Sequence, residues 1–182
     1  MEYTQKNVTL KNGRGCTIRR GEETDAELLL AYLRATAAET PYLTRTPEES
    51  DIPLEEERAI IREKNEEDGV LNLLAFVDGR HAGNCAFNPA DDGSQTRHRC
   101  CIGIALYREF WGMGIGTVLM EEILAAAKAA GYERAELEVV SANAPAVALY
   151  RKFGFETTGT VPEAVKYKDG TYADFLFMTK RL

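Results

Sequence analysis

Residues 102–117 constrain the fold of this chain more than any other segment. An apolar run, 102–106, leads through a short loop to three alternate glycines, Gly112, Gly114 and Gly116, which open directly into an amphipathic helical pattern. The start of a helix leaves backbone N–H groups without partners and carries the positive end of the helix dipole. Glycines at this position allow a bulky anion to approach the main chain closely. The sequence therefore predicts a phosphate or diphosphate site, and with it a phosphorylated cofactor.

The spacing of these glycines excludes two common classes of nucleotide-binding loop. A P-loop needs a lysine directly after its last glycine, whereas Gly116 is followed by Thr117 and Val118. A dinucleotide-binding fold needs its glycines directly after the strand, and here residues 107–111 intervene. Alternate glycines can also relieve crowding between a strand and a helix. The loop by itself therefore leaves a purely structural role open.

Composition narrows the class of protein. The 182 residues fit one domain, 1–182, in which we expect 1–14 to be a peripheral N-terminal segment. Residues 48–68 contain ten acidic and three basic side chains, a balance of −7 that equals the net charge of the whole chain. This acidity argues against nucleic acid as a partner, and no apolar run is long enough to cross a membrane. The four cysteines lack metal-ligand spacing, so we expect free thiols, no metal and a cytoplasmic location.

Hydrophobic periodicity and turn signals predict alternating strands and helices. The expected strands are 17–19, 71–77, 81–87, 96–106, 135–140 and two after Phe155, the second of them 172–180. The expected helices are 24–38, introduced by a capping box from Thr24 to Glu27, one entered at Pro53, one at 114–130, and one from Asn143 to Gly154. Hairpins followed by a strand–helix–strand–helix–strand run indicate an α/β fold with a mixed sheet.

A second motif follows the glycine loop at a fixed distance. It has the form N-x-x-A-x-x-x-Y-x-x-x-G-F, with Asn143, Ala146, Tyr150, Gly154 and Phe155 at the specified places. With this motif the chain resembles the GNAT superfamily of acetyl-CoA-dependent N-acetyltransferases, over about residues 15–182. The family's glycine motif, [QR]-x-x-G-x-[GA], is matched at both glycines, but Trp111 stands at its first place.

The resemblance implies a fold and a cofactor. The implied fold is a twisted, mixed but mostly antiparallel sheet of about six to seven strands, flanked by about four helices, with a splayed central strand pair. The implied co-substrate is acetyl-CoA, its pantetheine arm paired with the main chain of Ile104 and Leu106, and the Leu106 N–H near the thioester oxygen. The other implied cofactor-binding residues are Gly112, Met113, Gly114, Ile115, Gly116, Thr117, Asn143 and Lys152. Asn143 is equally typical of a helix cap, and Lys152 of a solvated surface lysine.

The resemblance also assigns a general acid, whereas the general base stays open. Tyr150 lies on an apolar helical stripe, typical of a core aromatic, but its phenol can protonate a departing thiolate. Similar proteins often place a glutamate at the start of the central strand, where this chain has Cys100 and Cys101. The remaining base candidates are Glu138, His98 and Glu39. Because the family transfers acetyl directly, no acetyl-cysteine is expected.

These features lead to one functional hypothesis and two alternatives. The hypothesis is direct transfer of acetyl from acetyl-CoA to a primary amine of a small amine, an amino acid or a protein. The alternatives are a CoA-binding or CoA-sensing module without turnover, and a nucleotide-binding regulator. The acidic segment 48–68 slightly favours cationic amines. A homodimer through the last strands is common in similar proteins, although no residue here indicates it.

Overall fold

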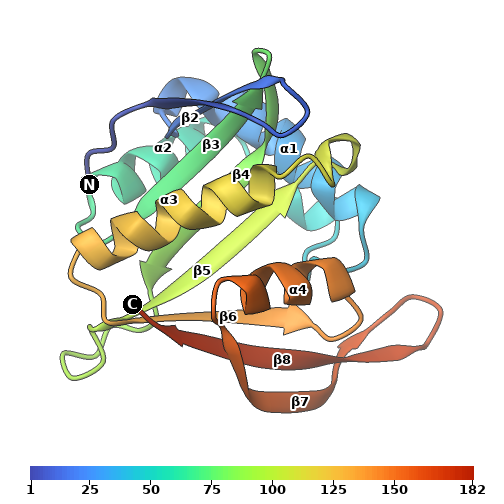
Figure 1. Ribbon diagram of the computed structural model, residues 1–182. Helices are drawn as coiled ribbons and strands as arrows, with labels where there is room; N and C mark the ends of the chain where they lie inside the picture. Colours follow the sequence, from blue (N-terminus) through green and yellow to red (C-terminus); the bar gives the residue numbers. More distant parts are fainter.

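An eight-stranded sheet runs through the computed structural model, which describes residues 1–182, and helices cover both of its faces (Figure 1). The strands are β1 (Lys6–Thr9), β2 (Gly15–Arg20), β3 (Leu71–Val77), β4 (Arg80–Pro89), β5 (Arg99–Leu106), β6 (Arg134–Val140), β7 (Glu156–Lys166) and β8 (Tyr172–Arg181). The helices are α1 (Ala26–Glu39), α2 (Leu54–Glu66), α3 (Ile115–Ala129) and α4 (Ala144–Lys152), with short 3-10 turns η1 (Glu23–Asp25), η2 (Glu48–Ser50) and η3 (Arg108–Phe110).

The centre of the sheet is split. The strand order is β1-β2-β3-β4-β5-β6-β8-β7, and every neighbouring pair is antiparallel except β5 and β6. These two parallel strands pair only where Arg99–Cys101 meets Arg134–Glu136, and they then diverge toward their C-terminal ends (Figure 1). The mixed, mostly antiparallel α/β sheet with a splayed central pair is therefore confirmed, with eight strands instead of six to seven.

The additional strand lies in the N-terminal segment. β1 pairs with β2 at the edge of the sheet, from Lys6 opposite Ile18 to Thr9 opposite Gly15. Its sequence, Lys-Asn-Val-Thr, is short and mostly polar, so it carries no strand signal of its own. These residues form a strand because they pair with β2, and not because of their own strand propensity.

Two cores lie on opposite faces of the sheet. The larger contains α3 and α4 and includes Leu73 and Leu119, both fully buried. The smaller lies under α1 and α2 and includes Leu74, which is also fully buried. Because successive strand residues point to opposite faces, the neighbours Leu73 and Leu74 serve different cores. β3 is thus covered on both sides.

The start of α1 differs from the sequence prediction. The capping box is formed by Glu22 and Asp25, not by Thr24 and Glu27, because the Asp25 carboxylate accepts a hydrogen bond from Glu22 N at 2.8 Å. Arg19 on β2 also donates to both oxygens of Asp25, at 2.7 and 2.6 Å. This ion pair connects the start of the helix to the sheet. It also explains why the buried Asp25, and not the preceding threonine, takes part in the capping box.

A β-bulge sets the geometry of β4 beside the splayed strand. The register between β3 and β4 shifts so that Ala75 faces Gly83 while Phe76 faces His81. Gly83 has a φ of +150°, and a methyl group there would lie 2.3 Å from the Ala105 carbonyl oxygen of β5. Only glycine permits this close approach of β4 to β5.

We predict that Gly83→Ala lowers the free energy of unfolding by about 3 kcal/mol, because backbone must move to admit the methyl group. Gly79→Ala is the matched control, since Gly79 also has a positive φ but its methyl group would meet nothing within 4 Å. There we expect about 1 kcal/mol from left-handed strain alone. Urea unfolding of both variants measures the difference, and equal losses would contradict the proposed clash.

Candidate functional site

The three alternate glycines have two different structural roles. Gly112 and Gly114 have φ values of +76° and +87°, which favour glycine, and open space surrounds the position of a side chain at both. Gly116 lies inside the first turn of α3, where a methyl group would meet Leu149 of α4 at 3.2 Å. The first two glycines therefore shape the loop, and the third allows α4 to pack closely on α3.

The loop presents a row of unpaired donors. The backbone N–H groups of residues 112–116 donate to no acceptor in the protein. The next two amides, of Thr117 and Val118, bond to the Gly114 carbonyl at 3.0 and 3.2 Å. Five consecutive free N–H groups at the positive end of a 15-residue helix form a site for an anion. Thr117 was predicted to belong to this row, but its amide is occupied and it can contribute only its hydroxyl.

The splayed edge of β5 leads toward this loop. The Tyr107 N–H bonds to the Ala82 carbonyl of β4 at 3.0 Å. Because main-chain groups alternate along a strand, those of Ile104 and Leu106 point away from β4, into the gap that β6 leaves. The predicted pair Ile104 and Leu106 thus lies along the open edge that ends at the anion site.

Trp111 braces the junction between β5 and the loop. Its indole Nε1 donates to the Leu106 carbonyl oxygen at 2.9 Å, across the 3-10 turn η3. The residue as a whole stays 41% exposed. The side chain at the first motif position therefore satisfies the free carbonyl of Leu106 and fixes the start of the loop.

Helix α4 lies beside the loop and carries three predicted residues. The Asn143 side chain accepts a hydrogen bond from Ala146 N at 3.3 Å, so its predicted role as a helix cap is confirmed. Lys152 Nζ donates to Thr117 Oγ1 at 3.2 Å, which joins the end of α4 to the first turn of α3. Tyr150 is 6% exposed, and burial raises the pKa of its phenol well above the usual value of 10. The Tyr150 hydroxyl makes no hydrogen bond within the protein, so it remains a protonated, uncommitted donor.

The structure separates the three base candidates. Glu39, at the end of α1, lies next to the open end of β5, where its Oε2 accepts a hydrogen bond from Arg108 N at 2.7 Å. Glu138 is exposed on β6, on the splayed part that no longer pairs with β5. His98 precedes β5 at the opposite end, where its carbonyl accepts bonds from Glu133 N and Arg134 N. Since a strand rises about 3.3 Å per residue, roughly 23 Å of β5 separates His98 from the loop, and the structure does not bring it to the site.

The cysteines are unsuited to nucleophilic attack. All four are free thiols; Cys100 is buried and Cys101 is exposed, on opposite faces of β5, because successive strand residues alternate. Burial raises the pKa of Cys100 to about 12 and also raises the pKa of Cys101, where nearby Glu136 and Glu138 add to the effect. Both groups are therefore neutral thiols near neutral pH.

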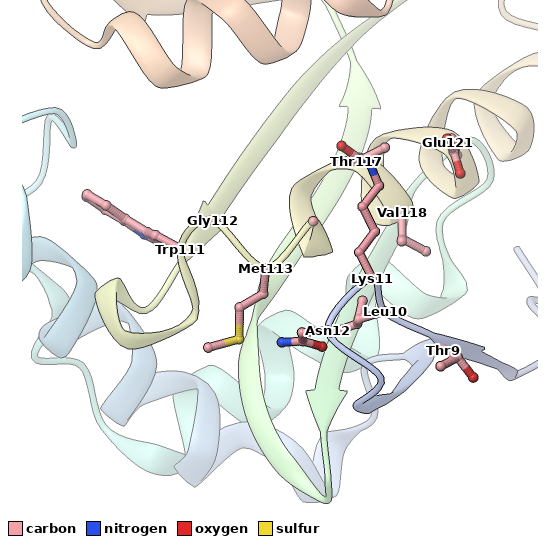
Figure 2. A pocket seen from close by; sticks show the side chains of 11 residues that line it. Thr9, Leu10, Lys11, Asn12, Trp111, Gly112, Met113, Thr117, Val118 and Glu121 are labelled. Carbon is pink, nitrogen blue, oxygen red and sulfur yellow. The ribbon is translucent and has the colours of Figure 1, made fainter.

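A cavity adjoins the glycine loop on the side of the N-terminal hairpin. Its volume is about 690 Å³, and Figure 2 shows side chains from the β1–β2 loop facing those of the glycine loop and of α3. The lining residues are Thr9, Leu10, Lys11, Asn12, Trp111, Gly112, Met113, Gly114, Thr117, Val118 and Glu121. The contribution of residues 9–12 was missed from the sequence, because only the pairing of β1 with β2 brings them to α3.

Two further structural findings concern metals and membranes. No group of three or more His, Cys, Asp or Glu side chains is placed to hold a metal ion. None of the helices combines the length and the apolar character that a membrane span requires.

Comparison with known protein families yields one match that includes both the glycine loop and the second motif. Residues 31–155, which include the glycine loop and the second motif through Phe155, match the acetyltransferase (GNAT) family. The chain belongs to this family. It is therefore an acetyltransferase with the family's splayed sheet.

Similar proteins carry related names. The L-amino acid N-acetyltransferase AaaT of Escherichia coli K12 is 30% identical over 115 residues, which cover 62% of this chain and 68% of that protein. A GNAT-family acetyltransferase structure from Streptococcus pneumoniae is 30% identical, with a TM-score of 0.87 over 92% of this chain and 99% of that one. A phosphinothricin acetyltransferase from Sinorhizobium meliloti, in complex with acetyl-CoA, shares the fold at 21% identity, with a TM-score of 0.81 over 92% of this chain and 88% of that one.

We predict that Trp111→Phe keeps the aromatic ring but frees the Leu106 carbonyl and so loosens the loop. The free energy of unfolding should fall by about 1 kcal/mol, the usual net contribution of one hydrogen bond. Amides 112–116 should exchange with solvent faster in hydrogen-exchange measurements. Tyr172→Phe, at an exposed aromatic on β8, is the control and should change neither quantity. Unchanged exchange in Trp111→Phe would contradict the bracing role.

Proposed function

We propose that this enzyme transfers acetyl from acetyl-CoA directly to a primary amine, with amino acids as the first class of acceptor to test. The observation that carries the proposal is the row of five unpaired N–H groups, 112–116, at the end of the splayed edge of β5. A diphosphate can take these donors, and an extended pantetheine arm can pair with the main chain of Ile104 and Leu106. Asn143 and Lys152 lie on α4, at the other side of the same opening.

The transfer follows from groups near the splay. The neutral amine attacks the thioester carbonyl carbon, forming the C–N bond, and the Leu106 N–H donates to the developing oxyanion. Collapse of this intermediate breaks the C–S bond. The Tyr150 phenol then gives its proton to the departing thiolate, which leaves as the CoA thiol. The phenolate takes a new proton from water, and the base releases to water the proton that the amine lost. Burial raises the pKa of Tyr150, so the phenol is protonated before transfer and the phenolate left afterwards regains a proton readily.

The proton that the amine loses needs an acceptor, and we assign this role to Glu39. One of its carboxylate oxygens is held by Arg108 N, while the other is free beside the end of β5. Glu138 lies across the splay on β6 and is the second candidate. The neutral thiols of Cys100 and Cys101 support direct attack by the amine, without an acetyl-cysteine.

Two different observations support the proposed class of acceptor: the name of one relative and the charge of one segment. The name of the E. coli relative supports an amino acid as acceptor. The acidic segment 48–68 begins at η2, where hydrogen bonds with its own backbone and with Thr46, and more weakly the charge of Lys168, lower the pKa of Glu48. These acidic groups favour acceptors with a positive charge, such as basic amino acids and polyamines.

The test is an assay of thiol release with acetyl-CoA and a panel of amines. The panel contains the common amino acids, polyamines and short peptides with free N-termini, and mass spectrometry identifies the acetylated product. Turnover with at least one amine supports the proposal. Tight binding of CoA without turnover on any amine would instead support a CoA-sensing module. An increase in the melting temperature with NAD or ATP, but not with CoA, would support a nucleotide-binding regulator.

We predict that Tyr150→Phe lowers kcat about 100-fold, because the thiolate then departs without a proton donor. The affinity for acetyl-CoA should change little, since the ring and its packing against Phe155 are retained. Steady-state kinetics and calorimetric titration separate the two effects. The control Tyr172→Phe should keep the full kcat, and a kcat of Tyr150→Phe equal to that of the parent would remove this residue from the mechanism.

We predict that Glu39→Gln also lowers kcat about 100-fold, since it removes a general base. The amide oxygen of glutamine can still accept the hydrogen bond from Arg108 N, so the local structure should remain. Glu138→Gln is measured alongside as the comparison. A large loss in Glu138→Gln with none in Glu39→Gln would transfer the assignment from α1 to β6.

A further inference from the structure

The loop between β1 and β2 is held firmly against the cofactor loop. The Leu10 side chain is buried in the larger core, and residues 10–14 form a tight turn with hydrogen bonds of 2.9 Å from Leu10 N to Arg14 O and from Gly13 N to Leu10 O. Arg14 donates to Asp78 at 2.7 Å and reaches Met113 Sδ of the glycine loop at 3.8 Å. This turn therefore has a fixed position relative to the anion site.

A second set of contacts fixes the same hairpin on α3. Glu122 accepts hydrogen bonds from Tyr3 at 3.0 Å and from Lys6 at 2.6 Å. The hairpin is thus fastened at Glu122 on one side and at Met113 on the other. Lys11 lies between these attachments, at the turn of the hairpin.

Lys11 differs from the other cations of the hairpin because it has no acidic partner. Lys6 pairs with Glu122 and Arg14 with Asp78, whereas Lys11 takes part in no ion pair or side-chain hydrogen bond. Figure 2 shows its side chain crossing the cavity toward Thr117, in the first turn of α3. Lys152 reaches the same threonine from α4, with its ammonium group 3.2 Å from Thr117 Oγ1.

Two lysines without acidic partners thus lie near the first turn of α3, since Lys11 lines the cavity together with Thr117 and Lys152 contacts Thr117. One comes from an N-terminal hairpin and the other from the last turn of α4, so their sequence positions are unrelated. Glu121 also lines the cavity, one helical turn beyond Thr117. One lysine therefore lines the cavity and a second contacts one of its lining residues, next to the free amides of the glycine loop, and this combination is suited to a phosphate group.

We propose that the β1–β2 loop is part of the coenzyme A site and that Lys11 binds a phosphate group of the coenzyme. This inference rests on the proposed function, because it takes acetyl-CoA to be the ligand of the glycine loop. Coenzyme A has two phosphate-containing groups that Lys11 could bind, the diphosphate and the 3′-phosphate. Lys11 adds a charged donor to a site that the motifs otherwise build from the main chain of 112–116 and from α4.

The test compares binding of CoA and of dephospho-CoA, which lacks the 3′-phosphate, by calorimetry on the full chain. Lys11→Met keeps the length of the side chain and removes its charge. We expect CoA to bind about five- to tenfold more weakly, the loss of one charge-assisted hydrogen bond. Lys11→Arg should restore most of the affinity. Lys128→Met is the matched control, since Lys128 lies about 16 Å along α3 from Thr117 at 1.5 Å per residue, and it should bind CoA like the parent.

The two ligands distinguish the phosphate that Lys11 holds. A loss with CoA but not with dephospho-CoA identifies the 3′-phosphate, and an equal loss with both identifies the diphosphate. If Lys11 serves only to balance Glu121, the parent and Lys11→Met will bind CoA equally, and the inference is wrong while the proposed function stands. If the parent itself binds no CoA, the proposed function fails and this inference fails with it.

Discussion

The loss of pairing between β5 and β6 is the constraint on which the rest of the site depends. A continuous sheet would pair the main-chain groups of Ile104 and Leu106, whereas the split after Cys101 leaves them unpaired along a half-buried strand edge. Free main-chain groups inside a protein are costly unless a ligand or a side chain satisfies them. Here the Trp111 indole takes one of them, the Leu106 carbonyl, and the others remain for an extended ligand. Packing on both faces of the sheet, with Leu73 and Leu74 buried on opposite sides, holds this opening in place.

The glycine loop and the split act as one unit because the same short segment joins them. η3 carries the chain from Leu106 to Trp111 within a few residues, and α3 begins directly after Gly114. The anion site therefore lies at a fixed distance from the edge that would hold the pantetheine arm. α4 closes the opposite side, where Gly116 allows Leu149 to approach α3 and where the buried Tyr150 phenol lies. A cofactor with a diphosphate at one end and an extended arm at the other fits such a site.

Much of this could be predicted because the signals are local. The helix start after Gly114, the cap at Asn143 and the strands 71–77 and 81–87 each follow from a few neighbouring residues, and the structure contains all of them. Errors arose where distant contacts decide. β1 forms a strand because it pairs with β2. The capping box forms at η1, between Glu22 and Asp25, where Arg19 holds Asp25. The Thr117 amide is occupied by the first turn of α3. The distance between His98 and the glycine loop likewise depends on the fold, because His98 precedes β5 at the end opposite to that loop.

Trp111 is the only tryptophan of the chain, and the residue is 41% exposed beside the glycine loop. Its indole is hydrogen-bonded to the strand that would carry the cofactor, and the Arg108 guanidinium lies 5.7 Å from the ring centroid. All tryptophan emission from this protein thus originates at one place, directly before the free amides of the glycine loop. Quenching of the intrinsic tryptophan fluorescence would therefore measure ligand binding to the glycine loop without an added label.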